Sequence, residues 1–149
     1  MAIGDVTTYG GKETKAIELL ASATATNSPP SGASAGLATK ALLRLFGGMP
    51  SVCTLLLYST AGSGTMTVTC RLWGYSEAGT VWTPMGFGAD STKGVINAVS
   101  AIGETVTDGI RHSETVSLPG HFSRLYLEIT AIGGTATAVT AQLVARRGV

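Results

Sequence analysis

The sequence predicts an all-β protein that folds as one antiparallel β-sandwich or barrel of about eight or nine strands. Two observations predict this class. Short segments rich in Val, Ile, Leu, Thr and aromatic residues recur along the chain, and these residues suit a half-buried pleated surface. Turns that contain glycine or proline separate many of them. The length of 149 residues fits a single domain, 1–149, that can bury a substantial core.

The candidate strands share this composition and are Lys15–Ala21, Ala41–Phe46, Val52–Ser59, Met66–Tyr75, Thr80–Met85, Gly94–Ile102, Gly109–Leu118, Arg124–Ile132 and Ala136–Arg146. The least regular element is Ala35–Phe46. Its leucines and alanines also fit one face of a helix that ends at Gly47.

Two segments have little to bury. The segment Ala21–Ala35 is small, polar and interrupted by two prolines, so it cannot be a central strand and is predicted to be a long loop. Residues 1–14 are predicted to be a flexible N-terminal arm. Arms and loops of this kind are candidate contacts with partners, here through Asn27, Pro29 and Pro30, and plain terminal disorder is the alternative.

Two hairpins are predicted from the alternation of apolar residues. Folding the chain after Val52–Ser59 sets Leu57 opposite Met66 and Leu55 opposite Val68, so that the apolar partners share one side. At the C-terminal end, Arg124–Ile132 and Ala136–Arg146 are expected to pair across a glycine-rich connection.

The first hairpin would also oppose Cys53 and Cys70. A cross-strand disulfide between directly opposed residues is strained. The start, MAIGDVTTYGGKETK, lacks the charged and apolar regions of an export signal. Two buried thiols are therefore favoured over a disulfide, and without CxxC spacing they predict no zinc site.

The charge of the chain is low. Charged residues make up 13% of it, about half the usual share, and the net charge is +1. Such a surface predicts extensive contact with partners. It argues against electrostatic capture of nucleic acid, and no apolar run is long enough for a membrane span. Synthesis and retention in a cytosol are expected.

No motif predicts catalysis or a bound cofactor. Residues 32–36 match the G-x-S-x-G pattern around Ser34, but prolines precede them where a nucleophile elbow needs a strand. His112 and Glu114 share a face of a predicted strand, and His121 follows a turn. Together they could bind a metal, although a polar strand face with a loop histidine is favoured. We therefore predict no catalytic, cofactor-binding or metal-binding residue, no small-molecule substrate and no enzyme activity.

Three aromatic residues are the remaining candidates for a site. Trp73, Tyr75 and Trp82 flank the predicted turn at 76–79 and should lie close together. Three roles stay open for them: the end of the core, an interface with a partner protein, or a platform for a sugar ring.

The blocks TMTVTCRLWGYSEAGTVWTPMG and RLYLEITAIGGTATAVTAQLVARR resemble head decoration (cement) proteins of tailed bacteriophages. The resemblance covers roughly the last hundred residues and lies in Thr- and Gly-rich strands and turns. It implies a β-sandwich or jelly roll that forms a homotrimer. It further implies a virion protein, made in the host cytoplasm, that binds the major capsid protein on the capsid surface and braces neighbouring shell subunits. A tail, connector or fibre component and a carbohydrate-binding module are the alternatives.

Overall fold

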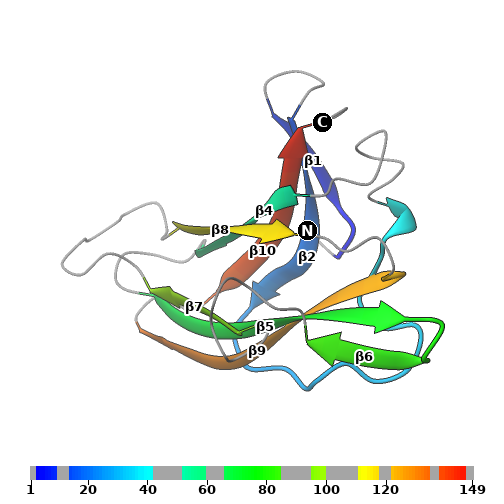
Figure 1. Cartoon of the computed structure of the whole chain (residues 1–149). Helices are drawn as coiled ribbons and strands as arrows, with labels where there is room; N and C mark the ends of the chain where they lie inside the picture. Colours follow the sequence, from blue (N-terminus) through cyan, green and yellow to red (C-terminus); the bar gives the residue numbers. More distant parts are fainter. Residues whose placement is uncertain are drawn as a thin grey trace.

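The computed structural model describes residues 3–9, 14–41, 52–59, 66–84, 95–99, 111–117, 122–134 and 138–146. These residues form two antiparallel sheets, and the predicted all-β class is confirmed (Figure 1). The strands are β1 (Val6–Tyr9), β2 (Thr14–Ala23), β3 (Leu37–Ala38), β4 (Val52–Ser59), β5 (Met66–Ser76), β6 (Val81–Pro84), β7 (Val95–Val99), β8 (Arg111–Ser117), β9 (Arg124–Gly134) and β10 (Val139–Arg146).

The order of the strands is that of a jelly roll. Sheet A has the order β1-β2-β10-β4-β8, and sheet B has the order β3-β9-β5-β6 with β7 also paired to β5. Strands from the two ends of the chain pair in a nested series: β2 with β10, β3 with β9, β4 with β8, and β5 with β6. A long antiparallel ribbon rolled up on itself produces this nesting, and the ribbon here closes as a two-sheet sandwich.

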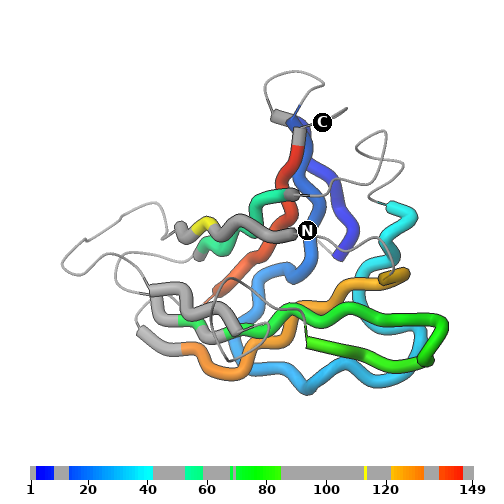
Figure 2. Tube along the Cα trace, viewed as in Figure 1, coloured from blue at the N-terminus to red at the C-terminus, as the bar shows by residue number. Residues whose placement is uncertain are grey.

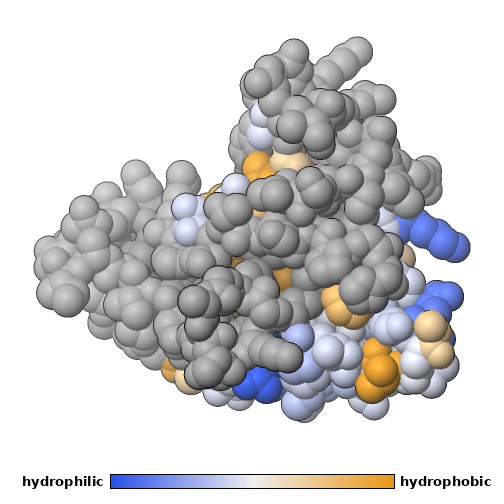
Figure 3. Space-filling view, in the orientation of Figure 1, coloured by the Kyte–Doolittle hydropathy of each residue, from blue (hydrophilic) through white to orange (hydrophobic). Residues whose placement is uncertain are grey.

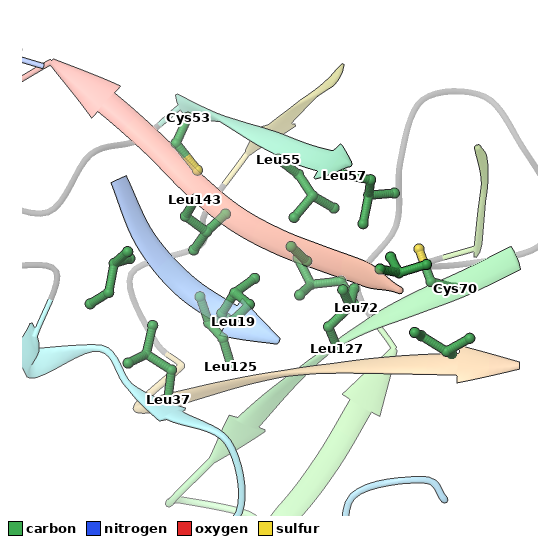
Figure 4. Packing of buried hydrophobic residues seen from close by; sticks show 14 of the residues in the cluster. Leu19, Leu37, Cys53, Leu55, Leu57, Cys70, Leu72, Leu125, Leu127 and Leu143 are labelled. Carbon is green, nitrogen blue, oxygen red and sulfur yellow. The ribbon is translucent and has the colours of Figure 1, made fainter. Parts of the chain in front are cut away.

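The core lies between the two sheets (Figure 4). Alternate residues of both sheets point into it, as the sequence predicts for half-buried strands. Leu55 and Leu57 of β4 and Leu143 of β10 meet Leu72 of β5 and Leu127 of β9, and all are at most 2% exposed. Each such leucine contributes about 1.5–3 kcal/mol through burial.

Both predicted hairpins are wrong in their pairing, although the predicted inward residues whose side chains are described, such as Leu55 and Val68, are buried. Strand β4 pairs with β10 and β8, whereas β5 lies in the other sheet and pairs with β9, β6 and β7. Strands β9 and β10 likewise belong to different sheets. Two apolar faces that meet across a sandwich show the same alternation as two strands paired edge to edge, so alternation could not separate the two arrangements.

The two cysteines are buried and free, as the sequence favoured. Cys53 of β4 and Cys70 of β5 come from different sheets and act as small hydrophobic residues in the core (Figure 4). Burial raises the pKa of the Cys53 thiol to about 12. The reactive thiolate is therefore scarce at neutral pH.

The predicted N-terminal arm is a strand over part of its length. Residues Val6–Tyr9 form β1 and pair with the outer edge of β2, and Thr14 already belongs to β2. Gly4, with φ +90°, and Asp5 together face Glu18 in a local bulge that leads into the strand. The four residues Val-Thr-Thr-Tyr have high strand propensity, and they add a strand to the edge of the sheet. The composition of the N-terminal segment as a whole did not predict this strand.

The long loop is present but begins later than predicted. Strand β2 continues to Ala23, and residues 24–36 contain no strand. We call residues 24–36 the strap. Figure 2 shows the strap in light blue, passing along β9 and β6 before it joins β3. Strand β3 lies within the ambiguous segment Ala35–Phe46, of which residues 42–46 lie outside the described part of the chain.

A buried polar cluster joins the first and last long strands. Glu18 of β2 is 0% exposed and Gln142 of β10 is 1% exposed. The Gln142 amide Nε2 donates to Glu18 Oε1 and to the Tyr58 hydroxyl, while Glu18 Oε2 and Gln142 Oε1 have no hydrogen-bond partner among the described residues. Burial raises the pKa of the Glu18 carboxyl, and the charge of Asp5 adds to this, against the opposing effects of the Gln142 hydrogen bond and the N-terminal charge.

This arrangement predicts that stability falls as pH rises. A carboxyl whose pKa is higher in the folded than in the unfolded chain contributes stability below the unfolded pKa and loses it as pH rises through the folded pKa. Glu18→Gln should remove this loss and stabilise the protein by about 1 kcal/mol at neutral pH, because the new amide can donate to Gln142 Oε1. Urea denaturation between about pH 4 and 8 measures it. The control is Glu77→Gln at an exposed turn, and equal pH profiles in both variants would contradict the prediction.

Candidate functional site

The candidate site lies on the outer face of sheet B, where an aromatic row crosses three strands. In β5 the inward Cys70 and Leu72 alternate with the outward residues Trp73 and Tyr75. The register places Trp73 opposite Tyr126 of β9 and Tyr75 opposite Trp82 of β6, and opposed residues share a face. Trp73, Tyr75 and Trp82, which the sequence grouped, therefore do lie together, but outside the main core.

Three rings of this row, those of Tyr75, Trp82 and Tyr126, contact one another. Tyr75 and Trp82 have centroids 5.2 Å apart with planes tilted by 54°, and Trp82 meets the edge of Tyr126 at 6.1 Å. Aromatic pairs favour these tilted and edge-on arrangements. Tyr126 is not among the residues predicted from the sequence, because it lies far along the chain from the 76–79 turn that groups the other three. Its signal is the alternation Leu-Tyr-Leu, which turns Tyr126 outward between two core leucines.

The strap lies over this aromatic row. The Tyr126 hydroxyl donates to the Ser28 carbonyl at 2.9 Å, and Trp82 Nε1 donates to the Gly32 carbonyl at 2.9 Å. Covered in this way, Tyr75 is only 7% exposed although it is on the outer face of the sheet. Burial, and then the Glu128 carboxylate, raises the pKa of Tyr126, which keeps its hydroxyl protonated as a donor.

Arg124 fastens the end of the strap. Its Nε donates to the Ala35 carbonyl at 2.5 Å, and its Nη2 donates to the carbonyls of Ser34 and Gly36 at 3.0 and 2.7 Å. All of these acceptors are backbone oxygens. The strap is therefore held through hydrogen bonds to its backbone, and several of its side chains point outward.

Asn27 closes the edge of β9 beyond the short strand β3. Its backbone N–H donates to the Ile129 carbonyl at 3.2 Å, its Oδ1 accepts from the Ile129 N–H at 2.6 Å, and its Nδ2 donates to the Leu127 carbonyl at 3.1 Å. Asn27 was a candidate for contact with a partner, but its amide is engaged within the fold. Of the other strap candidates, Pro29 is exposed and Pro30 is half-buried.

Trp73 lies at the other end of the row in a polar setting. Its Nε1 donates to Glu128 Oε2 at 2.7 Å, and the Arg71 guanidinium carbon lies 5.7 Å from its ring centroid. Glu128 is only 7% exposed. The indole is thus flanked by side chains on its own sheet, and it does not offer both an open face and a free N–H.

The exposed part of the site is a corner made by the strap and the β5–β6 turn. We define the corner as residues 28–34 and 77–81, which the hydrogen bond from Trp82 to Gly32 ties together. Most of these residues are exposed, including Val81 at 51%, and Glu77 is the only charged residue in the two segments. Figure 3 shows pale, weakly polar surface and a hydrophobic patch in the region where Figure 1 places β6.

The other candidate chemistry finds little support in the described residues. Ser34 lies in the strap with no strand before it, unlike the serine of a nucleophile elbow. His112 and Glu114 occupy alternate positions of β8, opposite Leu57 and Leu55, while His121 lies outside the described residues. Within the described ranges, no three His, Cys, Asp or Glu residues come together as metal ligands. Nor does the described part of the chain contain a helix with the length and hydrophobicity of a membrane span.

Comparison of the chain with family models, with curated proteins and with solved structures finds no match.

Proposed function

We propose that this protein is a non-enzymatic structural subunit of a tailed-phage particle, which binds the major capsid protein on the outside of the capsid and cements neighbouring shell subunits. The corner on sheet B is the observation that carries the proposal. It is exposed, nearly uncharged and held in place by side chains of two strands, β6 and β9. Interface centres are depleted in charge, and a preorganised surface loses little entropy on binding.

The jelly-roll topology and the low overall charge support the same proposal. Viral capsid proteins and lectins both use jelly rolls, so the fold alone does not select a function. The resemblance noted in the sequence, together with 13% charged residues, favours a subunit that works in contact with others. Like the decoration proteins it resembles, the subunit would form trimers on the capsid surface of the virion.

The two alternatives differ in how well the geometry supports them. A tail, connector or fibre component would share all of these features, and only the number of copies per particle separates it from a decoration protein. A carbohydrate-binding module is supported less, because Tyr75 is 7% exposed and the polar groups of Trp82 and Tyr126 bind the strap. A sugar platform needs open aromatic faces.

Cosedimentation with undecorated capsids tests the proposal. We expect the wild-type chain to pellet with capsids in many copies, and Ala33→Glu or Val81→Glu to bind at least about tenfold more weakly, because each buries an unpaired carboxylate at the interface. Ser113→Glu, exposed on β8 of the other sheet, is the matched control and should bind like the wild type.

The possible outcomes test the proposed capsid binding and the proposed contact surface separately. A wild-type chain that stays in the supernatant would contradict the capsid proposal. A few copies per intact particle would point to the tail or connector instead. Normal binding by both corner variants would place the contact on another surface.

A further inference from the structure

Strand β1 is an edge strand with an unusual composition for that position. It is the end strand of sheet A, and among the described residues it pairs only with β2 (Figure 1). Proteins commonly protect such edges with Lys, Pro or covering segments, as Asn27 covers the edge of β9 here. The β1 sequence VTTY has no charge and no proline, and Val6 is 49% exposed.

The backbone groups that face this edge can be assigned from the ladder with β2. Val6 lies opposite Ile17, and the Glu18 N–H donates to the Asp5 carbonyl at 2.9 Å. This bond marks Val6 and Ile17 as a non-hydrogen-bonded pair in an antiparallel ladder. Because the pattern alternates, the N–H and C=O of Thr7 point to β2, while those of Val6 and Thr8 point away from it.

We propose that β1 pairs antiparallel with β1 of a second copy of this chain. If Thr7 lies on the twofold axis, Val6 faces the partner's Thr8, and each such pair exchanges both hydrogen bonds through its outward-pointing groups. The opposed side chains are then β-branched and uncharged, a favourable combination for cross-strand pairs. The contact is isologous, as a twofold requires, so it is separate from the threefold contact within a proposed trimer and joins copies from two trimers. It unites two five-stranded sheets into one continuous sheet.

A cysteine scan of β1 tests the register as well as the contact. In Thr7→Cys the two new cysteines would face each other at a non-hydrogen-bonded position, with Cα atoms about 4.5 Å apart. This separation is at the lower end of the disulfide range, so the bond can form, although it is strained. In Val6→Cys and Thr8→Cys the new cysteines would be offset along the strands. Cys53 and Cys70 are buried and contribute little background.

On mild oxidation we expect Thr7→Cys to form a covalent dimer at least about tenfold faster than either neighbour. Equal rates at the three positions, or no dimer from any of them, would overturn the proposal. Because the assay uses the isolated chain, its outcome is independent of capsid binding.

Sedimentation velocity over a range of concentrations provides a second measurement without new thiols. Val6→Lys places a charge on the β1 edge and should weaken self-association by at least about tenfold. Ser113→Lys is the control, since Ser113 is also exposed but lies on β8, at the opposite end of sheet A. If Val6→Lys associates as the wild type does while remaining folded by circular dichroism, β1 is not the contact.

Discussion

Replacing Gly36 with alanine is expected to lower the free energy of unfolding by about 3 kcal/mol. Gly36 has φ +69°, a left-handed conformation that costs a residue with a Cβ about 1–2 kcal/mol. A Cβ at this position would also lie only 2.1 Å from the Leu125 carbonyl oxygen. That neighbour is backbone of the central strand β9, so relief requires the end of the strap and β9 to move apart.

Gly32 provides the matched control within the same strap. It has a similar φ of +78°, but in the described part of the chain no heavy atom lies within 4 Å of the position that its Cβ would occupy. Gly32→Ala should therefore cost only the conformational term of about 1 kcal/mol. Urea denaturation of the two variants measures the difference, and equal losses would show that the close approach of Gly36 to β9 is unimportant.

The effect of Gly36→Ala should extend to the proposed contact surface. The Gly36 carbonyl accepts from Arg124, and the neighbouring carbonyls of Ser34 and Ala35 share the same guanidinium. A displaced Gly36 would loosen this clamp and the corner that depends on it. Gly36→Ala should then bind capsids more weakly than Gly32→Ala, provided that both are compared under conditions in which they are folded.

Much of the fold could be predicted from the sequence, because the alternation of apolar and polar residues indicates which side chains of a strand face inward. The sequence predicted β4 at Val52–Ser59 with the observed bounds, and it assigned Cys53, Leu55 and Leu57 to one face. It could not predict the neighbours of β4, since strand partners in a jelly roll are far apart in the chain. β10, which follows β4 by some eighty residues, has no local signal that identifies it as a partner.

The aromatic residues of the candidate site could be predicted from the sequence, but the strap that lies over them could not. Trp73, Tyr75 and Trp82 flank one turn, so local spacing was sufficient to group them. The side chains of Trp82 and Tyr126 bind the strap through its backbone carbonyls, which every residue possesses. The sequence of the strap therefore predicts only that it is not a strand. Asn27 was predicted to be a loop residue available to partners. Its actual contacts are with backbone groups about a hundred residues away, which local sequence does not indicate.

Asn27→Ala should destabilise the protein by about 2 kcal/mol, because it leaves the Ile129 N–H and the Leu127 carbonyl without their side-chain partners. Asn27→Asp is the informative comparison. Its carboxylate keeps an acceptor for the Ile129 N–H but loses the donor to Leu127, so it should cost about 1 kcal/mol.

Amide hydrogen exchange locates this effect on the edge of β9. In Asn27→Ala the Ile129 amide should exchange faster than in the wild type, whereas in Asn27→Asp it should keep most of its protection, because only the alanine variant removes its acceptor. Unchanged protection of Ile129 in Asn27→Ala would mean that another group takes over the edge. If both variants lose protection equally, an acceptor alone does not hold the Ile129 amide, and the bond from Asn27 Nδ2 to the Leu127 carbonyl is also needed to close the edge of β9.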